Sequence, residues 1–171
     1  MQRRELFSFL SSSIKGEEKK QEQITLRPPY YDDLSLFHNE CSKCEAKCAT
    51  VCEEEIIKIA EDKTPYLDFS NGGCTFCDEC ALACEFEVLQ VQNVKNIEAD
   101  VFINQSTCIS WDGVMCFSCK DPCLEDAIDF KAMFMPTIDM SKCTGCGFCI
   151  SRCPTWAISL KTKQKDDDAT V

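Results

Sequence analysis

The stretch CTGCGFCISRCP, residues 143–154, decides the fold of this 171-residue chain. It spaces four thiols as C-x2-C-x2-C-x3-C and ends in a proline. Two-residue steps turn the chain around one face of an iron–sulfur cubane, and backbone N–H groups in such a turn point toward the sulfurs. Gly145 and Gly147 allow the tight backbone conformations that this requires. The stretch therefore predicts a 4Fe–4S site, with the last cysteine carried away on a helical turn.

The same arrangement occurs four times, and the first cysteines of successive groups lie 33, 34 and 35 residues apart. We call these groups quartets one to four. The sixteen predicted cluster ligands are Cys41, Cys44, Cys48 and Cys52; Cys74, Cys77, Cys80 and Cys84; Cys108, Cys116, Cys119 and Cys123; and Cys143, Cys146, Cys149 and Cys153. Helical repeat arrays share this period, but they need long apolar stripes that this chain lacks.

The quartets are not identical. Quartet two has the spacing of quartet four, with Glu85 in place of the proline. Quartet one has three residues instead of two in its middle step, and quartet three has seven residues between Cys108 and Cys116. A longer loop can still wrap a cubane, but the insertion in quartet three is also compatible with a loose or lost cluster. We therefore expect three to four 4Fe–4S clusters.

Competing uses of sixteen cysteines are disulfides and zinc. No secretory signal and no apolar run of the roughly 18 residues that span a bilayer is present. Thiols of a cytoplasmic protein stay reduced, which disfavours a disulfide scaffold. Structural zinc sites pair two C-x2-C knuckles a dozen or more residues apart, often with histidine, whereas this chain has one histidine and compact quartets. A thiol-rich metal store without an electron role is the remaining alternative of this class.

Strand-like runs surround the quartets and predict the fold class. They follow each fourth cysteine, as EEEIIKI, EFEVLQV, LEDAIDF and PTWAISL, and precede three of the first cysteines, as YLDFSNGG, VFINQST and PTIDMSK. Each unit reads as strand, cysteine loop, helical turn and strand, so two units make a β-α-β-β-α-β module. We predict an α+β, loop-rich fold of two tandem bacterial-ferredoxin-like modules organised around the clusters. Quartets pair either one with two and three with four, or one with four and two with three.

The predicted domains are an N-terminal docking segment and linker at 1–37, modules at 38–92 and 93–161, and a disordered tail at 162–171. In the first segment Leu6, Leu10 and Ile14 recur at helical spacing behind Arg3 and Arg4. This pattern indicates either a short amphipathic segment, which docks a partner or lies on a membrane surface, or a frayed terminus.

Charge limits the partners. The formal net charge is −11, and four clusters with their sixteen thiolates bring it to roughly −19, which repels nucleic acid and favours a basic dock on a protein partner. No acid–base pair, nucleophile, phosphate loop or flavin site is recognisable, so we predict no catalytic residues and no enzyme activity.

Several other residues have competing interpretations. His38 precedes quartet one but is interpreted as a surface residue, because four cysteines already complete that site. Trp111 and Trp156 either shield clusters from solvent or fill ordinary packing. Glu45, Asp78 and Glu79 lie inside cysteine loops, either as a solvated face or as charges that lower a cluster potential.

The four quartets, the C-x7-C step of the third, and the segments RRELFSF and LRPPYYDD together resemble the NapF family of ferredoxin-type proteins, which accompanies periplasmic nitrate reductase. The resemblance covers nearly the whole chain, except residues 16–23 and those after 161, and the x3 step of quartet one departs from the family pattern. It implies a cytoplasmic 4Fe–4S protein that contacts the precursor of the molybdenum-containing catalytic subunit NapA and assists its maturation before export. The alternative is a general electron-transfer subunit between a donor dehydrogenase and a redox partner.

Overall fold

The computed structural model describes residues 25–162. The prediction for the amphipathic N-terminal segment lies outside the described residues. So does the predicted tail at 162–171, except for Thr162, which belongs to the last strand. Among the described residues, no helix has the length and apolarity needed to cross a bilayer.

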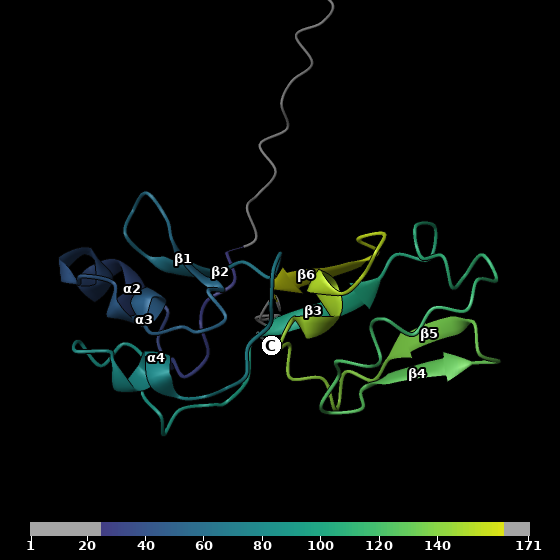
Figure 1. Cartoon of the computed structure of the whole chain (residues 1–171). Coiled ribbons are helices and arrows are strands. Elements are labelled where there is room, and N and C mark those ends of the chain that lie inside the picture. The colour runs from purple at the N-terminus through teal and green to yellow at the C-terminus, as the bar shows by residue number, and fades with distance from the viewer. Residues whose placement is uncertain (1–24, 163–171) are drawn as a thin grey trace, which may run out of the picture.

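The C-terminal half has the strand order expected of a ferredoxin-like module (Figure 1). Its elements are β3 (Ala99–Ile103), β4 (Ile128–Lys131), β5 (Met135–Ile138), α5 (Phe148–Ser151) and β6 (Ile158–Thr162). The outer strands β3 and β6 pair antiparallel with Val101 opposite Leu160, and β4 and β5 form an antiparallel hairpin with Ile128 opposite Ile138. Quartet three lies between β3 and β4, and quartet four between β5 and β6.

The N-terminal half repeats this plan in part. Its elements are α2 (Ser35–Glu40), the 3-10 helix η1 (Cys41–Lys43), α3 (Lys47–Thr50), β1 (Ile57–Ile59), β2 (Pro65–Leu67) and α4 (Glu79–Leu82). Strands β1 and β2 form an antiparallel hairpin between quartets one and two, in the place that β4 and β5 take in the other half.

One predicted strand, EFEVLQV at residues 85–91, is wrong, because these residues form turns. Its partner would be the segment before quartet one, where Pro28 and Pro29 have no N–H to donate to a ladder. Isolated hydrogen bonds replace the ladder: Gln90 donates its backbone N–H to the carbonyl of Tyr30 at 2.8 Å, and Tyr30 donates to the carbonyl of Val94 at 3.3 Å.

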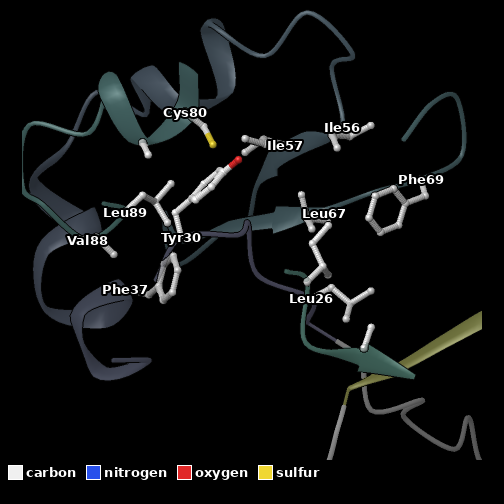
Figure 2. Packing of buried hydrophobic residues seen from close by; sticks show 13 residues of the cluster. Leu26, Tyr30, Phe37, Ile56, Ile57, Leu67, Phe69, Cys80, Val88 and Leu89 are labelled. Carbon is white, nitrogen blue, oxygen red and sulfur yellow. The ribbon is translucent and has the colours of Figure 1, made fainter. Parts of the chain in front are cut away.

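Two clusters of buried hydrophobic residues stabilise the halves. The first, shown in Figure 2, includes Tyr30 and Phe37 together with both strands of the β1–β2 hairpin. The second centres on Val101, Ile128 and Ile158. Small, short-stranded halves like these bury little apolar surface, and most of the cysteines pack against one cluster or the other.

The two halves are in contact. Ile150 of α5 and Leu160 of β6 pack against both hydrophobic clusters. In Figure 1 the paired strands β3 and β6 lie between the β1–β2 hairpin and the β4–β5 hairpin. The fold observed over residues 25–162 is thus a loop-rich α+β arrangement of ferredoxin type.

Candidate iron–sulfur sites

The structure gathers the sixteen cysteines around four pockets, and each pocket takes three cysteines from one quartet and the fourth from another. Pocket A is lined by Cys41, Cys44, Cys48 and Cys84; pocket B by Cys74, Cys77, Cys80 and Cys52; pocket C by Cys108, Cys116, Cys119 and Cys153; and pocket D by Cys143, Cys146, Cys149 and Cys123. The exchange of fourth cysteines is the pattern of two-cluster ferredoxins.

This geometry separates the two pairings that the sequence leaves open. Cys52 lies with Cys74 and Cys77, and Cys84 lies with the first three cysteines of quartet one. Cys123 and Cys153 are exchanged in the same way between quartets three and four. Quartet one is therefore associated with two, and three with four.

The loop before the third cysteine has the same backbone turn in three quartets. Ala46, Asp78 and Gly147 adopt left-handed conformations, with φ of 58°, 68° and 85°, immediately before α3, α4 and α5. A left-handed residue is costly unless it is glycine, so the sequence signals this turn only at Gly147. In quartet one the added residue is accommodated beside a 3-10 turn, in which Cys44 donates its N–H to the carbonyl of Cys41 at 3.1 Å.

A second turn follows every fourth cysteine. The residue three positions later is left-handed and donates its backbone N–H to the carbonyl of that cysteine. These residues are Glu55, Glu87, Asp126 and Trp156, with φ between 47° and 54°. The next two side chains in each repeat, beginning at Ile56, Val88, Ala127 and Ala157, are buried. Sequence reasoning missed this turn, because none of the four left-handed residues is glycine.

The turn directs backbone N–H groups at cysteine sulfurs. Leu89 donates to Sγ of Cys84 at 3.4 Å, Ala127 to Cys123 at 3.4 Å, and Ala157 to Cys153 at 3.2 Å. Such donors offset the negative charge of a thiolate and are among the influences that set a cluster potential. Because these donors are backbone N–H groups, which all residues except proline have, they cannot be recognised from the sequence.

The pockets are apolar enough to oppose free thiolates. Burial, followed by the charges of neighbouring cysteines, raises the pKa of Cys48 to about 11 and that of Cys80 to about 12. Burial also raises the pKa of Cys149 far above its usual value. Thiolates here need a positive core beside them, since metal ligation requires deprotonated sulfur.

The long loop of quartet three closes on itself and leaves Cys108 at pocket C. The backbone N–H of Trp111 donates to the carbonyl of Cys108 at 2.9 Å, and the backbone N–H of Val114 donates to the carbonyl of Ile109 at 3.1 Å. Ser110 is buried at the base of this loop. The inserted residues therefore project as a turn without removing either flanking cysteine from the pocket.

Four sulfurs around each pocket fit a 4Fe–4S cubane, whose four irons each take one thiolate. A single zinc ion instead requires its sulfurs about 2.3 Å from one point. Within residues 25–162, no three histidine, cysteine or acidic side chains are arranged to hold a single metal ion.

Of the other residues singled out in the sequence, Asp78 lies at a cysteine pocket and His38 does not. His38 is exposed, with Nδ1 at 3.8 Å from Oδ2 of Asp62, and it does not line pocket A. Trp156 is 63% exposed. Asp78 lines pocket B and pairs with Lys95, with Oδ1 and Nζ 3.1 Å apart.

Comparisons with known proteins agree with this geometry. Residues 136–159, which contain quartet four, match the family model described as a 4Fe-4S binding domain. The ferredoxin-type protein NapF of Escherichia coli K12 is 31% identical over 140 residues, covering 80% of this chain and 84% of the relative. NapF of Haemophilus influenzae is 29% identical over 163 residues, covering 93% and 92%. The ferredoxin-type protein NapG of Haemophilus influenzae is 28% identical over 85% of this chain and 61% of its own.

The matches and the cysteine content together show that the protein binds multiple 4Fe–4S clusters and has an iron–sulfur electron-transfer role. The similarity to NapF is not confined to the cysteine motifs, since it extends over most of both chains. The chain belongs to the NapF family of ferredoxin-type proteins.

Proposed function

We propose that this protein is a cytoplasmic polyferredoxin that binds the precursor of NapA, the catalytic subunit of periplasmic nitrate reductase, and assists its maturation before export. Electron supply or cluster insertion is the assistance given, and the protein has no catalytic site of its own. The observation that carries the proposal is the match to a NapF protein over 93% of this chain. A match of that extent includes residues outside 25–162, so it reaches beyond the cysteine pockets.

All sixteen cysteines are proposed as cluster ligands, in the four exchanged sets that line pockets A to D. The lining of these pockets by four thiols each supports the assignment. Bound clusters supply reversible one-electron chemistry. The chain's own residues hold the thiolates, direct N–H groups at Cys84, Cys123 and Cys153, and cover the sulfurs with apolar side chains.

The chain is proposed to form two modules, divided near residue 93 as the sequence predicts. The association of quartet one with two and of three with four supports the tandem arrangement. Leu26, Tyr30 and Phe37 are buried in the first hydrophobic cluster, and we therefore extend the first module back from residue 38 to Leu26. The docking segment is then confined to the residues before it.

The partner is proposed to present a basic surface, because the cluster-loaded chain has a net charge of roughly −19 and attracts positively charged surfaces. Purified, iron-loaded protein should bind the NapA precursor, and deletion of residues 2–14 should weaken binding without loss of iron. Affinity should fall with ionic strength between about 50 and 200 mM salt. A loaded protein with no affinity for the precursor at low salt would overturn the maturation role and leave the cluster assignment intact.

The second candidate is a general electron-transfer subunit, favoured by the similarity to NapG, another ferredoxin-type protein. The two functions differ in the protein that this chain binds. Co-purification with the unexported precursor supports maturation. Rapid reduction by a dehydrogenase, with stoichiometric assembly onto it, supports the second candidate.

A further inference from the structure

The two halves of the chain meet where two cysteine loops touch. Cys74 donates its backbone N–H to the carbonyl of Cys146 at 2.6 Å, and Ile97 donates to the carbonyl of Thr144 at 3.1 Å. Cys74 lines pocket B and Cys146 lines pocket D. The contact thus joins a pocket of the first half directly to a pocket of the second.

Two glycines make this approach feasible. A Cβ on Gly147 would lie 2.3 Å from Cδ1 of Phe69, and a Cβ on Gly73 would lie 2.5 Å from Cγ of Phe148. Contacts this short do not occur between real side chains. A larger residue at position 73 therefore displaces the start of the quartet-two loop from Phe148, and one at position 147 displaces the quartet-four loop from Phe69. Gly147 is also left-handed, with φ of +85°, but that turn alone does not require glycine, because Ala46 and Asp78 adopt it in the other loops.

Pockets B and D are the inner pair at this contact, because Cys74 and Cys146 line them. Pocket A is joined to pocket B, and pocket C to pocket D, through exchanged fourth cysteines. These are Cys52 and Cys84 in the first pair, and Cys123 and Cys153 in the second.

We propose that Gly73 and Gly147 are positioning residues that hold pockets B and D close enough for the two modules to exchange electrons, which orders the sites A–B–D–C along the molecule. The proposal rests on the ligand sets given under the proposed function. In each exchange one electron leaves a reduced site in one module and is accepted by an oxidised site in the other, with no bond made or broken and no proton transferred. Tunnelling falls steeply with distance, so the close approach at this contact sets the coupling between modules.

The test is the magnetic interaction between clusters in the full chain, reduced with dithionite and measured by EPR, with iron counted in every sample. Gly147→Ala has a matched control in Gly113→Ala, because Gly113 has φ of +83° but no atom within 4 Å of an added Cβ. Gly73→Ala is compared with Gly72→Ala, whose nearest contact is the flexible carboxylate of Glu54 at 2.9 Å.

Among samples of equal iron content, we expect Gly147→Ala and Gly73→Ala to weaken the spin–spin splitting beyond the spread of wild type and both controls. Adding Phe69→Leu to Gly147→Ala removes part of the clashing ring and should restore splitting. Spin–spin coupling between the two clusters of one module is present in every sample. It therefore does not contribute to the difference between a variant and its control.

Equal splitting in wild type and all four glycine variants, at full iron content, would overturn the proposal. If a glycine variant loses iron, Phe69→Leu alone decides the question, since Phe69 lies outside every cysteine loop and a smaller side chain loosens the same contact. In that variant unchanged splitting overturns the proposal and weakened splitting supports it.

Wild-type iron well below about sixteen atoms per chain would instead contradict the ligand sets, so the failure of the proposal can be distinguished from the failure of the ligand assignment.

Discussion

Ala157 donates its backbone N–H to the sulfur of Cys153 at 3.2 Å, and this sulfur faces the cysteines of quartet three although it belongs to quartet four. Burial acts to raise the pKa of Cys153, but hydrogen bonds from the N–H groups of Thr155 and Ala157 outweigh it and leave the pKa below its usual value. The backbone N–H groups that follow Cys153 thus favour the charged form of a sulfur that lines its neighbour's pocket.

The exchange of fourth cysteines predicts non-additive losses of iron. Cys153→Ala and Cys108→Ala should each reduce the iron content from about sixteen to about twelve atoms per chain, because both remove a ligand of pocket C. The double variant should also retain about twelve. As a control, Cys108→Ala combined with Cys123→Ala removes ligands of two pockets and should retain about eight. Anaerobic iron and sulfide analysis measures this, and about eight atoms in the first double variant would contradict the exchange.

The segment before quartet one is predicted to stabilise the β1–β2 hairpin through Arg27. Its Nη1 donates to Oγ1 of Thr64 and to the carbonyl of Pro65, both at 2.7 Å, and Thr64 donates to Oδ1 of Asp62 at 2.7 Å. Because Thr64 is 1% exposed, Thr64→Val should lower the free energy of unfolding by about 1–3 kcal/mol.

Anaerobic urea denaturation measures the effect of Thr64→Val. The control is Thr137→Val, whose hydroxyl is near the surface and makes one long hydrogen bond of 3.4 Å. It should change the unfolding free energy by no more than about 0.5 kcal/mol. Equal effects of the two variants would show that the Arg27 network does not stabilise the hairpin.

Alkaline pH is predicted to destabilise the fold through Tyr31. Its hydroxyl donates to Oε2 of Glu98 at 3.1 Å, and burial, reinforced by the charge of Glu98, raises the pKa of Tyr31 to about 12. A tyrosine whose pKa is higher in the folded than in the unfolded state adds stability that is fully present below the unfolded pKa of about 10. That stability is lost as pH rises through 10 toward 12.

Urea midpoints between pH 8 and about 11.5 should therefore fall in wild type, and the fall should be shallower in Tyr31→Phe. Tyr66→Phe leaves the Tyr31–Glu98 pair intact and should retain the wild-type slope. Identical slopes in all three proteins would exclude Tyr31 as the source.

The sequence predicts the cysteine groups and most of the strands, but it does not predict the left-handed turns or the backbone N–H donors near the sulfurs. Cysteine spacing identifies the four quartets whose cysteines the structure gathers around pockets A to D, and all but one of the predicted β runs contain a strand. The exception, residues 85–91, depends on the prolines of a distant segment. The left-handed turns at Glu55, Glu87 and Trp156, and the N–H groups directed at sulfur, carry no residue signature. Gly73 reads as an ordinary loop glycine until Phe148 is placed against it.

Lys95 is predicted to raise the reduction potential of the cluster in pocket B. It pairs with Asp78, a residue of the pocket lining, and a positive charge favours electron addition while an unopposed carboxylate disfavours it. Lys95→Gln should lower one midpoint potential by an amount on the order of tens of millivolts. EPR-monitored redox titration measures this, with Lys131→Gln on β4 as a control that should shift no midpoint. A rise in potential, or no change, would show that Lys95 does not tune this site.

Removal of the clusters is predicted to unfold both modules together with their sulfur pockets. The strands have three to five residues each, and the cysteines form part of both hydrophobic clusters. A bound cluster joins cysteines from separate helices and loops. Without the cluster, the four cysteines of each pocket no longer hold these segments together. Circular dichroism and urea unfolding after treatment with chelator and oxidant should show loss of the cooperative transition, whereas mild chelator alone should leave it intact. Retention of the wild-type midpoint by iron-free protein would mean that the polypeptide folds on its apolar contacts alone.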